Sequence, residues 1–371
     1  MAASSIFAAL PGGTSRYGGL GDRNLLKWED AAAGAELPHA RGGAATAVWR
    51  FASQEVLYLF GGCSEVSCFD DMQRHDQRSM RWAEQSARGK APTRRKGHTM
   101  TLLGPAWAQQ LLVFGGWGGD GPVTNSLKAF ALATASWEVL SIAGTPPPAR
   151  WAHSTTAIDA SRMLVIGGEG VLPGQYFNDV TMFNLDEQQW SRMHPTGDGS
   201  SGRLIPSARM GHTATLIGEA VLVFGGYVNE LRGSRHHRVA SNELWALDLK
   251  GGVSSRRSGS VEADGMRWVK VPTIGQAPAA RGFHTAVAGG TNLFIAFGCD
   301  EVEAACFNDA YMLDTTCERR PMLPFPIPSP SAPSAPSAPS AFPLHSRARA
   351  PPRAAEPASA FILPPPFFSS A

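Results

Sequence analysis

The same arrangement of apolar and polar residues recurs five times along the chain. In each copy, a short run of large apolar residues stops at glycine, a residue that tolerates positive φ. Such a run is typical of a buried strand that ends in a turn. We therefore predict one buried strand in each copy. The five runs are VLYLFGG to Gly62, LLVFGG to Gly116, MLVIGG to Gly168, VLVFGG to Gly226 and LFIAFGC to Cys299.

Polar residues recur before each apolar run. An arginine precedes the run, with a proline three residues before it, and in four copies a histidine follows three residues after it. Since equivalent histidines occupy equivalent environments in a repeat, we expect hydrogen bonding within each repeat rather than a metal array. The pairs are Pro38 and Arg41, Pro92 and Arg95, Pro147 and Arg150, Pro206 and Arg209, Pro278 and Arg281; the histidines are His98, His153, His212 and His284, with Ala44 in the first copy.

A second anchor follows each glycine end, and in the first four copies a tryptophan follows the anchor. The anchors are Asp71, Ser126, Asp179, Glu243 and Asp309, and the tryptophans of the first four copies are Trp82, Trp137, Trp190 and Trp268. Each copy thus reads as four short strands, and the turn residues between them suit antiparallel neighbours. Because one four-stranded sheet cannot cover both its faces, copies of about 50 residues are expected to pack face to face around an axis.

The combination of Pro-x-x-Arg-x-x-His, an apolar run before Gly-Gly, Asn-Asp and a later Trp resembles the kelch repeat. The resemblance covers residues 25–316. It implies an all-β fold, a kelch-type β-propeller of four-stranded antiparallel blades in the galactose oxidase/kelch-like superfamily. It also implies a non-catalytic scaffold for protein–protein interaction.

The spacing of tryptophan and arginine suggests how the ring closes. Trp28 precedes Arg41 by thirteen residues, the spacing that also separates Trp82 from Arg95. The fifth copy has Arg320 where its tryptophan is expected. The N-terminal LLKW is therefore predicted to supply the missing strand and to close five blades. The alternative is a lost sixth repeat, because kelch propellers more commonly have six or seven blades.

Composition divides the chain into three parts. Residues 1–24 are expected to be a flexible N-terminal segment, residues 25–316 the propeller, and residues 317–371, rich in Pro, Ser and Ala, a disordered tail. A net charge of +2 names no partner, and no apolar stretch approaches the roughly 18 residues that cross a bilayer. Five cysteines fit a reducing compartment. The expected location is cytoplasmic; a transit peptide at the N-terminus is the alternative.

Two similar cysteine pairs occupy equivalent positions in the first and fifth copies. Cys63 and Cys68 lie in GGCSEVSCFDD, and Cys299 and Cys306 lie in FGCDEVEAACFND. Repetition explains this likeness without a metal. A zinc site made of four thiolates and a disulfide within each pair are the alternatives. We expect no metal and no cofactor.

Catalytic patterns of related propellers are not matched. A copper site like that of galactose oxidase requires two tyrosines, two histidines and a thioether cysteine, and the five tyrosines here are scattered among repeats. The Glu-x-x-x-Asp-x-x-x-His iron motif of plant specifier proteins finds Asp71 and His75, but Ser67 stands where Glu is needed. We therefore predict no catalytic residues; a propeller enzyme or a metal-dependent specifier is the alternative. Basic loops such as RGSRHHR are treated as solvated rather than as a nucleic-acid site.

Loops that differ between the copies indicate a binding face. The connections between second and third strands, and the residues just after each repeated arginine, are expected on one rim of the propeller. A rigid scaffold with variable loops on one rim is a common basis for recognition of a protein or peptide. The alternative is that these side chains plug the channel. The predicted partner-binding residues are Lys96, Trp117, Trp151, Met210, Tyr227 and Phe283.

Overall fold

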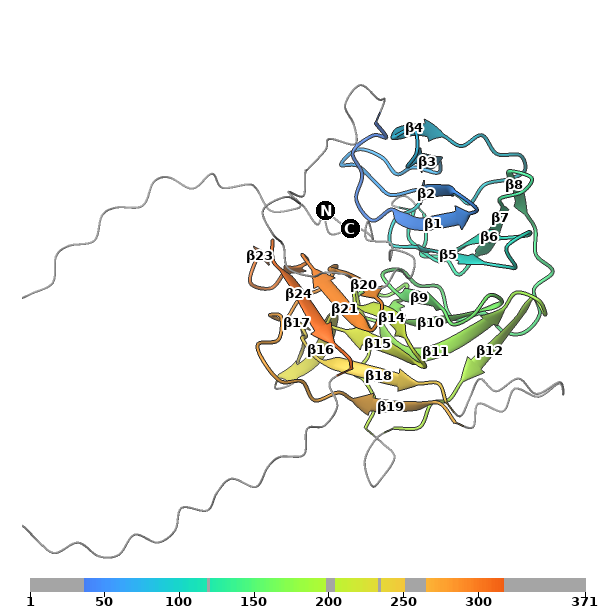
Figure 1. The fold of residues 1–371 in the computed structure, drawn as a ribbon. Helices are drawn as coiled ribbons and strands as arrows, with labels where there is room; N and C mark the ends of the chain where they lie inside the picture. Colours follow the sequence, from blue (N-terminus) through green and yellow to red (C-terminus); the bar gives the residue numbers. More distant parts are fainter. Residues whose placement is uncertain (1–36, 119–120, 198–203, 233–234, 251–264, 317–371) are drawn as a thin grey trace, which may run out of the picture. The chain divides into compact units, whose positions relative to one another are not determined.

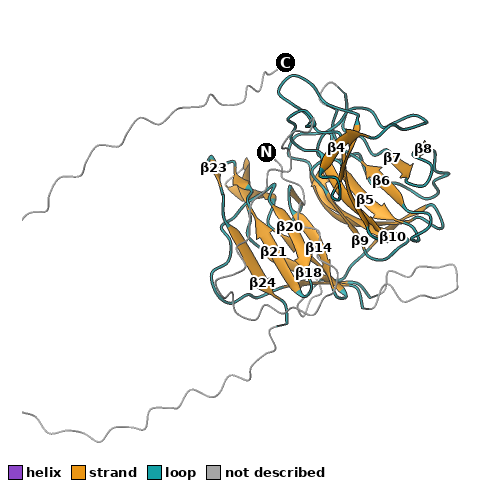
Figure 2. Ribbon diagram, turned by 45° about the horizontal axis from the view of Figure 1, so that its top comes forward, coloured by secondary structure: helices purple, strands orange, loops and turns teal. Residues whose placement is uncertain are grey.

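The computed structural model describes residues 37–118, 121–197, 204–232, 235–250 and 265–316. All regular structure in these residues is β-strand, which confirms the predicted all-β fold (Figure 2). No helix long and apolar enough to span a membrane occurs in the described residues. The predicted N-terminal strand and the C-terminal tail lie outside these ranges.

Four sheets of four antiparallel strands correspond to the first four copies. We number them as blades 1 to 4. Blade 1 is β1 (Ala45–Phe51), β2 (Gln54–Phe60), β3 (Met72–Asp76) and β4 (Arg81–Glu84); blade 2 is β5 (Thr99–Leu103), β6 (Gln110–Phe114), β7 (Leu127–Ala131) and β8 (Ser136–Glu138). Blade 3 is β9 (Ser154–Ala157), β10 (Arg162–Glu169), β11 (Tyr176–Asn184) and β12 (Gln189–Met193); blade 4 is β14 (Thr213–Ile217), β15 (Ala220–Phe224), β18 (Leu244–Asp248) and β19 (Arg267–Lys270).

The fifth copy forms a sheet of three strands among the described residues. Blade 5 consists of β20 (Thr285–Gly289), β21 (Asn292–Ala296) and β24 (Ala310–Asp314), in the order β20-β21-β24. Two smaller sheets stand at the ends of blades. One joins β13 (Arg209–Met210), β16 (Tyr227–Arg232) and β17 (Arg235–Ala240), and the other joins β22 (Cys299–Asp300) and β23 (Ala305–Cys306).

Successive blades follow one another around the axis (Figure 1). Apolar side chains fill the space between them. The tryptophan of a fourth strand packs against the phenylalanine that ends the second strand of the preceding blade. Trp137 lies 5.3 Å from Phe60 and Trp190 lies 5.1 Å from Phe114, measured between ring centroids. Burying such aromatic surface is a large stabilising contribution. The recurring tryptophan is therefore a contact between blades.

A chain of main-chain hydrogen bonds links the copies around the axis. The amide of Gly97 donates to the carbonyl of Gly43, and Ala152, Gly211 and Phe283 each donate in the same way to the equivalent residue of the preceding copy, all at 2.8 Å. The first residues of all five inner strands line one central cavity of about 530 Å³. This is the arrangement predicted for a kelch propeller. Within the described ranges, no bond of this kind joins Phe283 to Gly43, so five-bladed closure stays a prediction.

Candidate functional site

The repeated arginines hold the loops of each copy in place. Arg150 is fully buried, and its guanidinium donates to both carboxylate oxygens of Asp179 at 2.7 Å and to the carbonyl of Gly167. In every copy the arginine donates a hydrogen bond to the second anchor of its own copy. This partnership was not predicted, although both positions had been found as recurring. The pairs are Arg41 with Asp71, Arg95 with Ser126, Arg150 with Asp179, Arg209 with Glu243 and Arg281 with Asp309.

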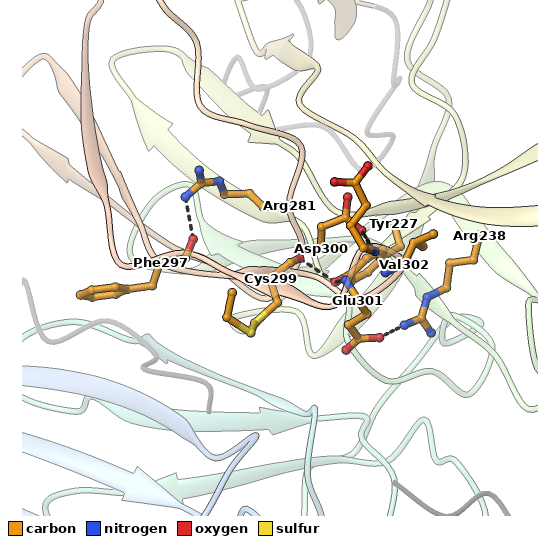
Figure 3. The surroundings of a disulfide bond; sticks show 10 residues. Tyr227, Arg238, Arg281, Phe297, Cys299, Asp300, Glu301 and Val302 are labelled. Carbon is orange, nitrogen blue, oxygen red and sulfur yellow. Dashed lines mark hydrogen bonds and ion pairs between the residues drawn. A yellow bond between two sulfur atoms is a disulfide. The ribbon is translucent and has the colours of Figure 1, made fainter. Parts of the chain in front are cut away.

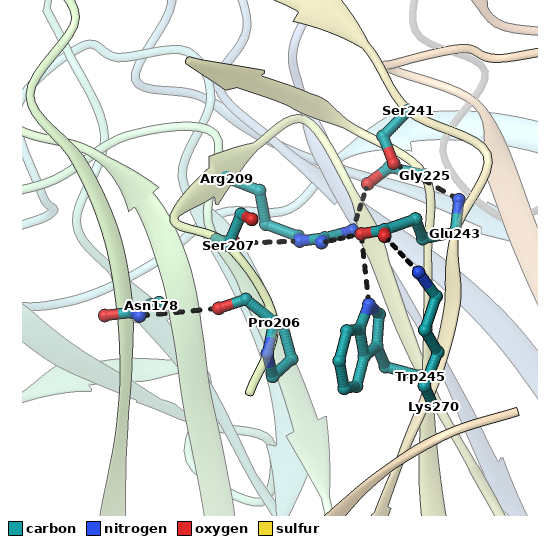
Figure 4. A network of polar contacts seen from close by, with 9 residues as sticks. All are labelled: Asn178, Pro206, Ser207, Arg209, Gly225, Ser241, Glu243, Trp245 and Lys270. Carbon is teal, nitrogen blue, oxygen red and sulfur yellow. Dashed lines mark hydrogen bonds and ion pairs between the residues drawn. The ribbon is translucent and has the colours of Figure 1, made fainter. Parts of the chain in front are cut away.

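In the fourth copy the second anchor is a glutamate, Glu243, and several side chains form hydrogen bonds with it (Figure 4). Glu243 accepts hydrogen bonds from Arg209, from the indole of Trp245 and from the ammonium of Lys270 at 2.6 Å. Burial alone would raise the pKa of Glu243, but these donors outweigh it and lower the pKa to about 2. The carboxylate is therefore fixed as a structural anion.

The repeated histidines bond to the preceding blade, not within their own repeat as predicted. Nε2 of His98 lies 3.1 Å from the carbonyl oxygen of Phe60, and Nε2 of His284 lies 2.8 Å from the hydroxyl of Thr213. His153 and His212 reach the preceding blade in the same way. The prediction had the right chemistry but the wrong partner, because spacing along the chain does not tell which sheet a side chain faces.

The residue two positions after each arginine has positive φ. Three of the five are glycines, whereas Ala152 has φ 51° and Phe283 has φ 53°. A phenylalanine in this conformation is uncommon and is retained where the surroundings hold it. The ring of Phe283 lies over Gly211, where a Cβ added to the glycine would be 3.3 Å from the phenyl ring. The ring of Trp151 lies over Gly97, where an added Cβ would be 2.9 Å from the indole.

These two aromatic residues meet at the mouth of the channel. Trp151 and Phe283 stack with ring centroids 6.5 Å apart and an interplanar angle of 27°. Trp117 lies 5.9 Å from Trp151, and the ammonium of Lys96 lies 4.8 Å from the ring of Trp117. The four side chains are partly buried, and three of them, Lys96, Trp151 and Phe283, line the central cavity. We name Lys96, Trp117, Trp151 and Phe283 the mouth cluster.

Two of the predicted binding residues lie beneath this cluster. Met210 is 1% exposed and Tyr227 is fully buried, and both belong to one apolar cluster with Trp151 and Phe283. Burial raises the pKa of Tyr227 to about 12, and its hydroxyl donates to the carbonyl of Cys299 at 2.6 Å. All six predicted residues are thus brought together, four of them accessible and two as their support.

The β16–β17 hairpin lies beside the mouth cluster, since its Tyr227 packs with Trp151 and Phe283. Arg238 forms an ion pair with Glu301 of the fifth copy (Figure 3), and its guanidinium lies 4.6 Å from the ring of Tyr227. Asn229 donates to the carbonyl of Gly174 in the β10–β11 loop. Sequence reasoning identified this stretch as a long loop but not as paired strands. Its alternating YVNEL and RVA ends were the available signal.

The cysteine pairs form two disulfides, Cys63–Cys68 and Cys299–Cys306. This was the weighed alternative to zinc, and within the described ranges no group of three His, Cys, Asp or Glu side chains is placed to hold a metal. Cys63 and Cys299 also line the central cavity. Disulfides are typical of oxidising compartments, so the cytoplasmic expectation loses the support it drew from the small number of cysteines.

Comparison with known families agrees with this architecture. The family model of the KLHDC2/KLHL20/DRC7 Kelch-repeats domain matches residues 20–226 and 204–341 of the chain. The chain belongs to this kelch-repeat family. The match spans all five repeats, so the resemblance found in the sequence is confirmed.

Individual kelch relatives share parts of the chain. The flagellar outer-arm dynein alpha chain of Chlamydomonas reinhardtii is 33% identical over 216 residues, 56% of this chain and 4% of the dynein chain. Acyl-CoA-binding domain-containing protein 4 of Arabidopsis thaliana is 28% identical over 260 residues, 68% of this chain and 34% of that protein. The solved structure of YjhT superposes with a TM-score of 0.54 at 15% identity, covering 73% of this chain and 81% of YjhT. The chain spans only 4% and 34% of the length of these two curated relatives. The YjhT likeness supports the fold alone.

Proposed function

We propose that this propeller is a non-catalytic scaffold that binds a protein or peptide at the mouth cluster. The observation that carries the proposal is the stack of Trp151 on Phe283 at the channel opening, where each ring lies over a glycine and Phe283 has positive φ. Partly exposed aromatic side chains on a rigid base make good anchors for a partner, because little conformational entropy is lost when they bind.

The surroundings of the cluster suit an extended polypeptide. Exposed apolar residues stand on the flanking segments: Val171 and Leu172 in the β10–β11 loop and Leu231 near the end of β16 are 60–66% exposed. The ammonium group of Lys96 and the ion pair of Arg238 with Glu301 provide polar contacts at the rim. Central aromatic anchors with a polar rim are the usual anatomy of a protein interface.

A catalytic role finds less support at this site. The two cysteine pairs form disulfides. The Nε2 atoms of the repeated histidines form hydrogen bonds with the preceding blades. Those groups are therefore occupied with structural contacts. We propose no cofactor for this face.

The proposal is tested by affinity capture with the full chain, followed by binding isotherms for each captured protein. Trp151→Ala and Phe283→Ala are each expected to weaken binding by about 1 to 4 kcal/mol. Trp107→Ala is the matched control, because Trp107 is 80% exposed in the β5–β6 turn at the opposite end of blade 2. Full affinity in the Trp151→Ala, Phe283→Ala double variant, or an equal loss in Trp107→Ala, would reject the site.

A further inference from the structure

The Cys299–Cys306 disulfide closes a small hairpin beside the mouth. It joins directly opposed residues of β22 and β23, two strands of only two residues each. The turn between them, residues 301–304, is exposed. A two-stranded hairpin is at best marginally stable by itself in water. The disulfide therefore holds together a hairpin that its few hydrogen bonds would leave mostly open.

The closed hairpin contacts the residue that supports the mouth cluster. The hydroxyl of Tyr227 donates to the carbonyl oxygen of Cys299 at 2.6 Å and accepts from the amide of Glu301 at 3.1 Å (Figure 3). The carboxylate of Glu301 forms an ion pair with Arg238, whose guanidinium lies over the Tyr227 ring. Tyr227 is fully buried, and its ring centroid lies 5.8 Å from that of Phe283. The hairpin thus holds Tyr227 in place against Phe283.

A second connection between the hairpin and the mouth runs through the main chain. Cys299 and Gly282 exchange two hydrogen bonds of 2.9 Å, and Gly282 directly precedes Phe283. The backbone of Phe283 has positive φ, a conformation that persists only where the surroundings hold it. Loosening of Cys299 would therefore reach Phe283 through the chain as well as through Tyr227.

The Cys63–Cys68 disulfide lies at the equivalent position of the first copy but has different contacts. The loop between its cysteines is held by its own turn, in which the amide of Ser64 donates to the carbonyl of Ser67 at 2.8 Å. Within the described ranges, no hydrogen bond or ion pair joins residues 63–68 to the mouth cluster or to Tyr227. The two disulfides therefore differ in whether they support the mouth.

We propose that Cys299–Cys306 is a site of reversible thiol–disulfide exchange, and that its reduction loosens the mouth cluster. Cys306 is exposed and Cys299 is half-buried, so an external thiolate reaches the sulfur of Cys306. A dithiol reductant forms a mixed disulfide with Cys306 and releases Cys299 as a thiolate; its second thiol then displaces Cys306. The reductant is oxidised to a cyclic disulfide, and two electrons and two protons pass to the two protein thiols.

Reduction changes what a partner must do to bind. Once the hairpin opens, the amide of Glu301 leaves the hydroxyl of Tyr227 and its carboxylate leaves Arg238. A partner at the mouth must then order this side of the rim again, which costs affinity. This consequence rests on the proposed function of the mouth, whereas the loss of order is measured without a partner.

Timed alkylation of the folded full chain in dithiothreitol tests the exchange site. Cys299 and Cys306 are expected to become labelled before Cys63 and Cys68, because Cys306 is exposed whereas both cysteines of the other pair are half-buried. Mass spectrometry of the labelled peptides gives the two rates. Equal rates, or faster labelling of Cys63 and Cys68, would overturn the proposal.

Hydrogen exchange without a partner tests the loosening. Cys299→Ser with Cys306→Ser is expected to speed amide exchange in β16 and in the segment around Phe283, because their hydrogen-bond partners in the hairpin are lost. The matched control is Cys63→Ser with Cys68→Ser, which removes the equivalent disulfide and should leave these amides protected. Unchanged protection in the first variant, or equal loss in both, would overturn the proposal. Wild-type protein treated with dithiothreitol gives the same measurement if the first variant does not fold.

Binding isotherms for a captured partner test the consequence. The oxidised chain is expected to bind about fivefold or more tightly than the variant with Cys299→Ser and Cys306→Ser. Full affinity in the Trp151→Ala, Phe283→Ala double variant would reject the mouth as a binding site but would leave the labelling and hydrogen-exchange results to decide the switch. If those aromatic variants lose affinity while the oxidised chain and the serine variant bind equally, the mouth stands as the site and its control by this disulfide is overturned.

Discussion

Arg150 is fully buried and binds Asp179 through two parallel hydrogen bonds of 2.7 Å each. The phenyl ring of Phe177 lies 4.4 Å from the guanidinium carbon. The contact fastens the start of the inner strand to the beginning of the third strand of the same blade. Equivalent contacts recur in the other copies, and Lys96, Trp151 and Met210 each directly follow one of these arginines in the chain.

Removing one partner of this pair is expected to be costly. Asp179→Ala leaves the guanidinium of Arg150 buried without its counter-ion, and the free energy of unfolding should fall by about 3 to 5 kcal/mol. Urea unfolding measures the change. Glu55→Ala is the control, because the Arg50–Glu55 pair is partly exposed and its loss is expected to cost about 1 kcal/mol or less. Equal losses in the two variants would contradict a structural role for the buried pair.

The histidines between blades predict a loss of stability in acid. Burial lowers the pKa of His98, His212 and His284 to about 3 and also lowers the pKa of His153, against about 6.5 in an unfolded chain. Below pH 6.5 the unfolded chain therefore binds more protons than the folded chain. Stability is fully present above this pH and falls as the pH drops toward 3, by up to about 1.4 kcal/mol per pH unit for each histidine.

Urea unfolding at pH 7.5 and pH 5 tests this expectation. His98→Gln should make the dependence on pH shallower than in the wild-type protein, because one buried histidine with a lowered pKa is removed. Equal stability at the two pH values would show that the buried histidines do not resist protonation.

The repeat made the fold predictable, because Gly-Gly, Arg and Trp recur at fixed spacings and each spacing reports a strand or turn. The partners of these residues were harder to predict. Arg150 and Asp179 were each recognised, but 29 residues separate them and only the folded blade aligns their hydrogen bonds. His153 faces the blade before it because inner strands pack side by side, a relation that a linear pattern does not contain.

The mouth could be predicted only in part. Variation after each arginine pointed to Trp151 and Phe283, which do meet. The same criterion chose Met210, which is buried because the β16–β17 hairpin folds over it through the pairing with Tyr227. Whether a variable residue faces solvent depends on the length and course of the neighbouring loop, and sequence variation does not report that.

The two disulfides should stabilise the loops that carry them. Each closes a loop of only a few residues, for which the reduction in unfolded-chain entropy corresponds to about 2 kcal/mol. Cys63→Ser with Cys68→Ser is expected to lower the free energy of unfolding by that amount, and a reducing agent should lower the wild-type value further, since it opens both disulfides. If neither the double variant nor reduction alters the urea midpoint, the disulfides are not stabilising.

Alanine substitutions at two glycines distinguish the free-energy cost of positive φ from the cost of disturbing the contact between blades. Gly115 has φ 66°, and an added Cβ would lie 2.7 Å from both the carbonyl oxygen of Arg150 and Cε1 of His153. Gly218 has φ 59° in the β14–β15 turn, where nothing lies within 4 Å of an added Cβ. Gly218→Ala therefore meets only the backbone penalty, about 1 kcal/mol. Gly115→Ala must also push blade 3 away from blade 2, at about 1 to 3 kcal/mol more. Urea unfolding of both variants measures the difference, and equal losses would mean that blades 2 and 3 are not in the close contact that the Gly-Gly repeat permits.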